Sequence, residues 1–444
     1  MKETTSMDHR SVALAVLDTV RSSGTLATAA MRKELERRHI EPRTGAGANR
    51  LALGVLRERT FLDWCLQQSV DRGLPYKDPR LMDILRIGAY ELLFMEGTPG
   101  YATLDSVVEL AKKTKGKRIS GFVNAVLRRT LKAIPQLREA RPGLPVDVRL
   151  SLPQWLLGEA RKAFGDGFEH ELAALHQPAP IALRVHTGRT TTADLKSELE
   201  KAGLHPAEVD ALPGALVLAP EEPPYRTLPF AQGLFWPQDL ASQVVASLAT
   251  AREARRILDA CAGLGTKTLQ LALDRKAEQV VVCADLSSRR IQSLQRRLEE
   301  VELSGFDCLV EDMTAPPDGL GEFDLVLLDA PCSGVGTIRR HPELKWRRTK
   351  KDNKNSVRLQ RALLESTAKL VSPGGALLYA VCSFGYDEGP GTVARFLENH
   401  TDFTDDRSRL PELLADSADP RGPGLLIRPT LLDSDCFYVA RLQR

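Results

Sequence analysis

The chain has 444 residues, of which 43% are hydrophobic and 27% are charged. These values are typical of a globular protein with roughly two to four domains. No apolar run reaches the ~20 residues of a membrane helix, and Met1–Arg10 lacks the apolar core of a secretory signal. These features exclude disordered, fibrous and membrane-spanning proteins, and we expect a cytoplasmic location.

The seven cysteines are irregularly spaced, and no two of them form a Cys-x-x-Cys pair. An odd number at irregular spacing argues against a disulfide framework, and the missing pair argues against a zinc knuckle or a redox motif. We therefore expect free thiols in a reducing compartment and predict no metal site.

The net charge of +3 is unevenly distributed along the chain. Residues 1–150 hold 26 Lys and Arg against 17 Asp and Glu, whereas the remainder holds 35 against 41. A basic first third indicates a polyanionic partner for that part of the chain. A solvated charged surface is the alternative interpretation.

Residues 8–140 follow a helical period. Val12, Val16 and Val20 recur at helical spacing, as do Leu104 and Val107, and these patterns predict an all-α bundle over residues 1–140. A basic run lies just before its last expected helix, Phe122 to Leu131, and a flexible loop is one interpretation of it. The density of positive charge favours the other interpretation, a phosphate-contact patch, made of Lys112, Lys113, Lys115, Lys117 and Arg118.

The next part of the chain predicts a linker and a small α+β module. From Pro135 to Pro153 proline and arginine are frequent and no period holds, which indicates an irregular linker. Between residues 150 and 230, the strand-like segments Ile181–Val185 and Leu216–Leu218 flank a helical pattern over Thr192–Gly203.

From residue 231 to residue 444, strands and helices alternate. Helices are expected over Ser287–Glu302 and Ser356–Val371, and the expected strands are Arg256–Ala260, Gln279–Ala284, Phe306–Val310, Phe323–Leu328 and Ala376–Val381. This alternation predicts a mostly parallel sheet with helices on both faces. In such sheets the ligands lie beyond the carboxyl ends of the strands.

The loop after the first of these strands has the features of a cofactor site. It follows Asp259 and runs from Cys261 to Lys267 with two glycines, which let the backbone approach a ligand closely. Asp285 ends the second strand, where an acid binds ribose hydroxyls, and Asp312 follows the third. The loop matches neither a dinucleotide nor a phosphate-loop motif, so we predict a nucleoside without a pyrophosphate. S-adenosylmethionine fits this description, and a structural tight turn is the alternative.

Two cysteines leave neighbouring strands at the same expected edge. The fourth strand leads into Asp329-Ala-Pro-Cys332, and the fifth leads into Cys382. One cysteine at a strand end is usually a buried apolar residue, but two beside a cofactor loop favour chemistry. Between them, the sequence places cations beside a flat ring, which suits phosphate contact and stacking on an extruded base: Arg339, Arg340 and Trp346.

These motifs are similar to a known family. Asp-Ala-Pro-Cys-Ser-Gly, followed by Arg-Arg-His-Pro-Glu-Leu-Lys-Trp and Tyr-x-x-Cys-Ser, resembles the RNA cytosine-C5 methyltransferases of the RsmB/Sun type, the Nol1/Nop2/Sun family. The resemblance covers nearly the whole chain, and Phe122–Arg129 resembles part of a NusB-type RNA-binding domain.

The resemblance implies a fold for each part of the chain. Residues 231–444 would form an α/β Rossmann-like S-adenosylmethionine-dependent methyltransferase domain. An all-α NusB-like domain over 1–140 and the α+β module over 150–230 would precede it. The implied substrate is a cytosine in RNA, with 16S rRNA favoured by the NusB-like domain, and we expect a monomer.

The resemblance also implies a role for each site residue. C5 of cytosine is a poor nucleophile until a thiolate adds to C6. Cys382 would be that nucleophile, Cys332 would act in the release step, and Asp329 would bond the amino–N3 edge of the base. Lys267 is the expected cation beside the thiolate. The implied cofactor contacts are Cys261, Ala262, Gly263, Leu264, Gly265, Thr266, Lys267, Asp285, Arg290, Asp312 and Asp329.

The chain departs from the family pattern at several positions. The usual loop reads Cys-Ala-Ala-Pro-Gly-Gly-Lys-Thr, where this chain has Gly263, Leu264 and Thr266. Val381 replaces the usual Thr before the nucleophile, and the usual Glu-Asn reads Glu388-Gly. Both cysteines and Asp329 are retained.

Three other functions stay open. A DNA cytosine-C5 methyltransferase would use the Pro-Cys332 pair as its nucleophile motif. A non-catalytic RNA-binding or assembly factor would explain the altered cofactor loop. A small-molecule methyltransferase would leave the basic first third unexplained.

Overall fold

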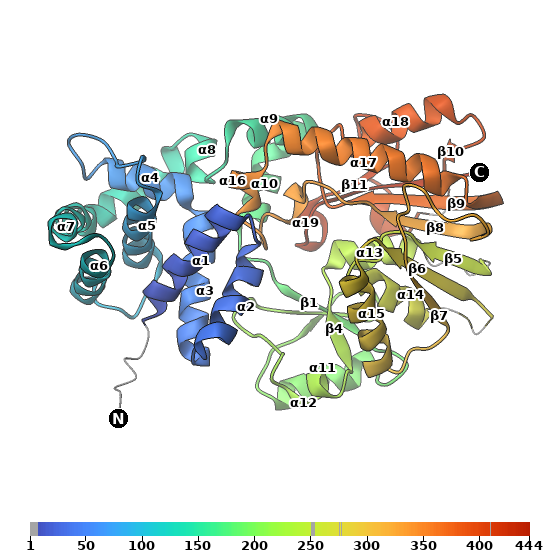
Figure 1. Cartoon of the computed structure of the whole chain (residues 1–444), viewed down its shortest axis with the longest axis horizontal. Helices are drawn as coiled ribbons and strands as arrows, with labels where there is room; N and C mark the ends of the chain where they lie inside the picture. Colours follow the sequence, from blue (N-terminus) through green and yellow to red (C-terminus); the bar gives the residue numbers. More distant parts are fainter. Residues whose placement is uncertain (1–7, 250–253, 275, 277, 409) are drawn as a thin grey trace. The chain divides into compact units, whose positions relative to one another are not determined.

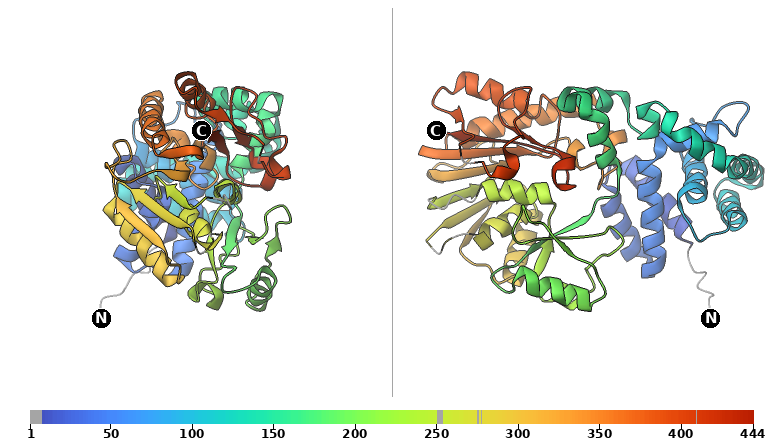
Figure 2. Two further views of the ribbon diagram at one scale, coloured as in Figure 1. Left: turned by 90° about the vertical axis from the view of Figure 1, so that its right-hand side faces the viewer. Right: turned by 180° about the vertical axis from the view of Figure 1, so that it is seen from behind.

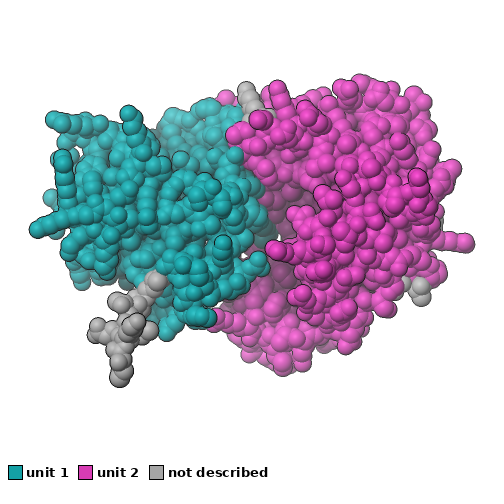
Figure 3. All heavy atoms as spheres, viewed as in Figure 1, with its two compact units in different colours: residues 1–158, 338–347 teal, residues 159–337, 348–444 magenta. Residues whose placement is uncertain are grey.

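The computed structural model describes residues 8–249, 254–274, 276, 278–408 and 410–444. The chain divides into two compact units (Figure 3). Unit 1 comprises residues 1–158 and 338–347, and unit 2 comprises residues 159–337 and 348–444. The chain therefore leaves unit 2 after Thr337, contributes a short segment to unit 1 and returns at Arg348. We call residues 338–347 the inserted segment. Among the described residues, no helix combines the length and the apolar character needed to cross a bilayer.

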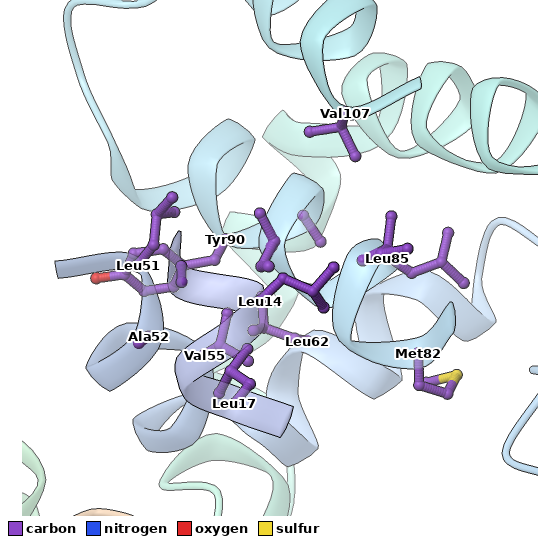
Figure 4. Close-up of a cluster of buried hydrophobic side chains, with 14 of the residues drawn as sticks. Leu14, Leu17, Leu51, Ala52, Val55, Leu62, Met82, Leu85, Tyr90 and Val107 are labelled. Carbon is purple, nitrogen blue, oxygen red and sulfur yellow. The ribbon is translucent and has the colours of Figure 1, made fainter. Parts of the chain in front are cut away.

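Unit 1 is a bundle of helices in its described residues (Figure 1). Its main helices are α1 (His9–Ser23), α2 (Ala27–Arg38), α3 (Pro42–Arg57), α4 (Arg59–Gln67), α5 (Pro79–Phe94), α6 (Gly100–Lys115) and α7 (Lys117–Ala140). Their apolar faces meet in one core, where Leu14, Leu51, Leu62, Leu85 and Val107 are buried (Figure 4). The helical period read from the sequence is the pattern that places these side chains on one face of each helix.

Two features of unit 1 differ from the sequence-based expectation. The basic run is helical, because α6 continues to Lys115 and α7 begins at Lys117. Only Gly116 separates the two helices, at φ 88°. The expected linker is also largely helical: α7 passes through Pro135 to Ala140, and α8 spans Val146–Arg149. Proline removes one helical hydrogen bond, but Leu137 is buried beyond it, so side-chain packing holds the helix together.

Unit 2 contains two sheets. The small antiparallel sheet has the order β2 (Ala207–Glu208), β3 (Ala215–Leu218), β1 (Ile181–Val185), β4 (Phe235–Pro237). Helices α10 (Phe168–His176), α11 (Thr192–Lys201) and α12 (Leu228–Ala231) accompany it, and α9 (Gln154–Phe164) precedes them.

The large sheet carries the candidate site. Its order is β10 (Thr404–Asp405), β12 (Phe437–Gln443), β9 (Val371–Val381), β8 (Phe323–Asp329), β5 (Arg256–Asp259), β6 (Val280–Asp285), β7 (Phe306–Val310), and β11 (Leu425–Ile427) pairs with β12. Strands β5 to β9 pair in parallel, whereas β12 runs antiparallel to β9. This mixed sheet with its helices confirms the α/β class, and Figure 2 gives two further views of it.

Helices cover both faces of the large sheet. Leu325 and Leu327 of β8 share a core with Val244 and Val245 of α13 (Leu240–Leu248), and α14 (Thr266–Asp274) packs against α13. On the other side, α17 (Lys350–Ala368) and α18 (Pro390–Asn399) lie side by side (Figure 1). The remaining helices are α15 (Ser288–Glu300), α16 (Leu344–Arg347), which belongs to unit 1, and α19 (Pro429–Leu432).

A chain of buried amides ties the small sheet to the large one. Trp236 Nε1 donates to Gln238 Oε1 at 2.9 Å, and Gln238 Nε2 donates to Gln270 Oε1 of α14 at 2.8 Å. Gln270 Nε2 in turn donates to the carbonyl of Gln243 in α13 at 3.1 Å. Because buried amides without partners are costly, this chain fixes β4 relative to the helices beside the first strand of the large sheet.

Unit 1 contains a buried ion pair whose loss should be measurable. Arg10 Nε donates to Glu91 Oε2 at 2.7 Å, and the Glu91 side chain is fully buried. Glu91→Ala leaves the buried Arg10 cation with only the partly exposed Asp8 carboxylate, at 2.9 Å, as a partner, so we expect the free energy of unfolding to fall by about 3 kcal/mol, the lower end for a broken buried pair. Urea titration followed by tryptophan fluorescence measures this, since Trp64, Trp155 and Trp346 lie in unit 1.

The control is Glu36→Ala. Glu36 pairs with Arg32 at 4.0 Å, and both side chains are exposed, so its loss should change the free energy of unfolding by at most about 1 kcal/mol. Equal effects of the two substitutions would contradict the assigned burial of the Arg10–Glu91 pair.

Candidate active site

Two thiols meet at the carboxyl edge of the large sheet. β8 and β9 pair in parallel with Asp329 opposite Ala380, so the residues after the two strands come out at the same place. Cys332 Sγ and Cys382 Sγ lie 3.1 Å apart, and both residues are partly exposed. The structure thus brings together the two cysteines that the sequence singled out.

The thiol pair is chemically asymmetric. The hydrogen bond with Cys382, together with burial, raises the pKa of Cys332 well above its ordinary value. Cys332 therefore holds its proton at neutral pH and can donate it toward the Cys382 sulfur. A nucleophile with a thiol donor beside it is an arrangement suited to covalent addition and later release.

A buried ion pair stands next to the thiols. Lys267, in the first turn of α14, places Nζ 2.5 Å from Oδ2 of Asp329 at the end of β8. Burial opposes the charged form of Lys267, but the Asp329 carboxylate outweighs it and raises the pKa of the lysine. The Lys267 cation also interacts electrostatically with Cys382 and lies 5.1 Å from the Phe437 ring. The site therefore holds a fixed positive charge beside the nucleophile candidate.

Glu388 joins the loops that carry the two cysteines, and sequence analysis did not assign it a role. Its buried carboxylate accepts a hydrogen bond from the backbone N–H of Ser333 at 2.7 Å and from the hydroxyl of Ser383 at 2.7 Å. Ser333 follows Cys332 and Ser383 follows Cys382, so one carboxylate holds both cysteines in register. Gln360 of α17 adds a donor to the same carboxylate at 3.2 Å. The sequence marked Glu388 only as the retained acid of the family's Glu-Asn pair, six residues after Cys382.

The glycine loop between β5 and α14 is shaped by Asp285. The Asp285 carboxylate accepts hydrogen bonds from Gly263 N at 3.0 Å and Ser287 N at 2.8 Å. Gly265 adopts φ +80°, and a Cβ there would lie 2.1 Å from Leu294 Cδ1. The loop therefore requires glycine at this position for both its conformation and its close approach to α15.

The loop residues fit a nucleoside cofactor. Asp285 Oδ2 accepts bonds from Gly263 N and Arg290, whereas Oδ1 accepts one bond from Ser287 N and keeps a lone pair for a ribose hydroxyl. Asp312 is exposed after β7, and hydrogen bonds from Thr314 lower the pKa of its carboxyl. Leu264 is 59% exposed and Leu286 is 72% exposed. Leu286 follows Asp285, and Leu264 follows Gly263, which bonds Asp285. Exposed apolar side chains beside this acid suit a base and its ribose, and Leu286 was not among the residues predicted from sequence.

The other predicted cofactor residues line the same loop. Arg290 lies 3.4 Å from Asp285 and is largely exposed. Burial raises the pKa of Cys261, which makes it an unreactive thiol. Ala262 and Thr266 complete the turn. The Ala262 carbonyl accepts a hydrogen bond from Gly265 N at 2.8 Å. Burial raises the pKa of Asp259 below the loop to about 6.

The predicted RNA contacts fall into two groups. Lys112, Lys113, Lys117 and Arg118 are exposed around the α6–α7 junction, although Glu109 lies within 3.3 Å of Lys112 and 3.9 Å of Lys113. Lys115 is partly buried and bonds Asp78 at 2.9 Å.

The second group lies in the inserted segment, in the packing of unit 1. Arg339 is 1% exposed, and the Arg339 carbonyl accepts a hydrogen bond from Arg57 at 2.8 Å. Trp346 donates to the Leu56 carbonyl at 2.7 Å, and Arg340 is partly buried. We therefore do not carry Arg339 forward as an RNA contact, because its side chain is enclosed.

Three family models match successive parts of the chain. The model described as 16S rRNA methyltransferase RsmB/F matches residues 246–443, and the NusB family matches residues 7–132. The Methyltr_RsmF/B-like, ferredoxin-like domain matches residues 152–223.

Full-length relatives and solved structures agree with these matches. Ribosomal RNA small subunit methyltransferase B of Vibrio cholerae is 32% identical over 413 residues, covering 91% of each chain. The probable methyltransferase B of Synechocystis is 27% identical over 98% of this chain and 99% of its own. The crystal structure of PH0851 has a TM-score of 0.78 at 22% identity and covers 99% of each chain. NSun6 from Pyrococcus horikoshii with SFG has a TM-score of 0.58 at 19% identity, over 66% of this chain and 98% of its own.

The Glu388 contacts lead to a prediction for Glu388→Gln. The amide keeps the shape of the side chain but replaces one acceptor with a donor, which leaves buried groups of Ser333 or Ser383 without a partner. We expect unit 2 to lose about 1–3 kcal/mol of stability and the alkylation rates of Cys332 and Cys382 to change. Denaturant unfolding and mass spectrometry of iodoacetamide-treated protein measure the two effects.

The control for this experiment is Glu398→Gln, which removes an exposed acid of α18. It should leave both the unfolding midpoint and the alkylation rates unchanged. If Glu388→Gln behaves in the same way as this control, Glu388 does not hold the two loops together.

Proposed function

The chain belongs to the RsmB/F family of 16S rRNA methyltransferases, which use S-adenosylmethionine, and on this premise we propose that it methylates C5 of a cytosine in small-subunit rRNA. Membership of the family confirms the resemblance and the cofactor predicted from the sequence. The choice of cytosine C5 is supported chiefly by one observation, the pair of thiols 3.1 Å apart at the exits of β8 and β9.

In the proposed reaction Cys382 begins the chemistry. Its sulfur, as the thiolate, forms a bond to C6 of the cytosine, and the electron pair of the C5–C6 double bond moves toward C5. Asp329 lies at the exit of β8, where it would hold the amino–N3 edge of the base. Lys267, bonded to Asp329 at 2.5 Å, keeps a positive charge beside the sulfur that attacks. When bound, S-adenosylmethionine supplies an electrophilic methyl group, which C5 takes up.

Cys332 completes the reaction. While Cys382 is free, the hydrogen bond between the two sulfurs keeps the pKa of Cys332 raised. Once Cys382 is bonded to carbon, its sulfur is neutral and this cause of the raised pKa is removed. Cys332 then gives its proton to solvent water, and the resulting thiolate takes up the C5 proton. The C5–H electron pair restores the C5–C6 double bond, and the S–C6 bond breaks with its electron pair returning to Cys382.

The cofactor would be held at the loop between β5 and α14. Asp285 would accept a hydrogen bond from a ribose hydroxyl, and Leu264 and Leu286 would contact the adenine. Lys112, Lys113, Lys117 and Arg118 are the proposed phosphate contacts of unit 1, supported by their exposure and by the basic balance of residues 1–150.

Methyl transfer to protein-free 16S rRNA tests the proposed function. Tritium from labelled S-adenosylmethionine should appear on cytosine C5 with the wild type. Cys382→Ala should reduce the rate by about 10³-fold or more, because no S–C6 bond forms. Cys332→Ala should accumulate a protein–RNA adduct that is retained on a denaturing gel.

Cys308→Ala is the matched control, since Cys308 is a partly exposed thiol of β7 outside the thiol pair, and it should transfer label at the wild-type rate. The DNA-methyltransferase alternative would reverse the roles, so an adduct abolished by Cys332→Ala would contradict the proposal. Absence of both label and cofactor binding would favour the assembly-factor alternative.

Cofactor binding gives a separate prediction for Asp285→Asn. The amide places a donor where the carboxylate accepts bonds, and hydrogen bonds to a charged group are worth about 1.5–3 kcal/mol. We therefore expect the affinity for S-adenosylmethionine to fall by about 10- to 100-fold in calorimetry. Asp307→Asn removes an exposed acid of β7 and should not change the affinity. A similar loss in both variants would indicate a general charge effect instead of the assigned contact.

A further inference from the structure

A cavity of about 480 Å³ opens in unit 1, and none of the residues assigned to catalysis lines it. Helices α1, α3, α4 and α5 and the inserted segment line it. Apolar side chains of α1, α3 and α5 form part of its wall, including Leu17, Val55 and Met82 (Figure 4). The volume lies in the range of small-ligand sites, roughly 300–1,000 Å³.

Four arginines line the cavity together with two acids, Asp83 and Glu343. Arg21 bonds Asp83, and Arg86 bonds both Asp63, at 2.7 Å, and Asp83, at 3.0 Å. Among the residues that the structure describes, the side chains of Arg59 and Arg347 form neither a hydrogen bond nor an ion pair, although Glu343 interacts electrostatically with Arg347. Burial lowers the pKa of Arg59 and the nearby Arg86 adds to this, while Asp63 and Asp83 offset only part of the effect. The cavity therefore presents two guanidinium groups to an anion.

The positions of these two arginines are well defined by their surroundings. The Arg59 guanidinium lies 5.1 Å over the Trp346 ring, and the indole is itself fixed by its hydrogen bond to the Leu56 carbonyl. Gly24 adopts φ +66°, and a Cβ there would lie 2.8 Å from Arg347 Nη2. The glycine thus leaves the space that the Arg347 guanidinium occupies.

The rim of the cavity connects to the basic run of α6. Tyr76 lines the cavity and is 56% exposed, which leaves a flat ring open for stacking. Two residues further along the chain, Asp78 caps α5 and bonds Lys115 at 2.9 Å. The exposed cations Lys112 and Lys117 follow on the same helical junction. A small anion would contact only the cavity. A polyanion would also reach the exposed cations Lys112 and Lys117, so it explains both features.

We propose that this cavity binds one nucleotide of single-stranded RNA, with its phosphate between Arg59 and Arg347 and its base stacked on Tyr76. The inference rests on the proposed RNA substrate and adds a second contact point, on unit 1, for the same strand. Planar guanidinium forks match phosphate geometry, and stacking on an aromatic ring is tolerant of base identity. The site therefore positions the RNA and does not choose the cytosine.

The test measures binding of a fluorescein-labelled single-stranded oligoribonucleotide by anisotropy across a salt series. Arg59→Gln and Arg347→Gln should each weaken binding about 5- to 10-fold and reduce the salt slope by about 0.7 for the lost phosphate contact. Tyr76→Ala should weaken binding without changing the slope. Arg32→Gln, at an exposed arginine of α2 outside the cavity, is the matched control and should bind as the wild type does.

Unchanged affinity and salt slope in Arg59→Gln and Arg347→Gln would overturn the inference, provided that circular dichroism gives both variants the wild-type melting curve. Arg59→Lys covers the case in which Arg59→Gln unfolds, since it keeps the charge and should retain part of the affinity. Equal competition by double-stranded RNA or polyglutamate would also overturn it. If the wild type transfers methyl groups to RNA and Arg59→Gln and Arg347→Gln bind RNA as it does, the cavity is not an RNA site. The proposed function would then still stand. A wild type that binds no RNA would reject both.

Discussion

The parallel pairing of β8 with β9 is the constraint on which the site depends. Register places Asp329 opposite Ala380, so Cys332 and Cys382 leave the sheet together and their sulfurs approach to 3.1 Å. Strand pairing alone fixes the strands and not the loops that follow them. The buried Glu388 carboxylate supplies the remaining restraint, because its bonds to Ser333 and Ser383 act on the residue after each cysteine. The geometry of the thiol pair is therefore a product of backbone pairing and one side chain.

Charge at this edge is arranged around that pair. Lys267 lies in α14, where the glycine loop ends, and Asp329 lies at the end of β8, so their ion pair links the expected cofactor side of the site to the thiol side. The same loop is held by Asp285, which bonds Gly263. A methyl donor bound by the loop and a base bound at the thiols would therefore be aligned by neighbouring elements of one sheet. Such prior alignment is how enzymes lower the entropic part of a barrier.

Much of this arrangement could be predicted from sequence, because it follows from local patterns. Alternating strands and helices placed Cys332 and Cys382 at one sheet edge, and the bounds of β1 and β7 agree with those expected. The inserted segment could not be assigned in this way, because its membership of unit 1 depends on contacts distant in sequence. Glu343 accepts a hydrogen bond from Ala27 N at 2.8 Å, and Trp346 bonds the Leu56 carbonyl. The prediction of an irregular linker from Pro135 was wrong for a similar reason. Packing around Leu137 stabilises a helix that proline disfavours locally. Glu388 was identified only as the acid of the family's Glu-Asn pair, and that position does not reveal that its carboxylate bonds both Ser333 and Ser383.

The central claim is that Cys382 forms the covalent bond to the cytosine, and that Cys332 removes the C5 proton so that this bond can break. The most direct measurement is tandem mass spectrometry of Cys332→Ala protein incubated with 16S rRNA and S-adenosylmethionine, after nuclease and protease digestion. The account predicts a cytidine remnant, carrying one added methyl group, on the peptide that contains Cys382. A remnant on the peptide that contains Cys261, or methylated RNA with no modified peptide, would contradict it.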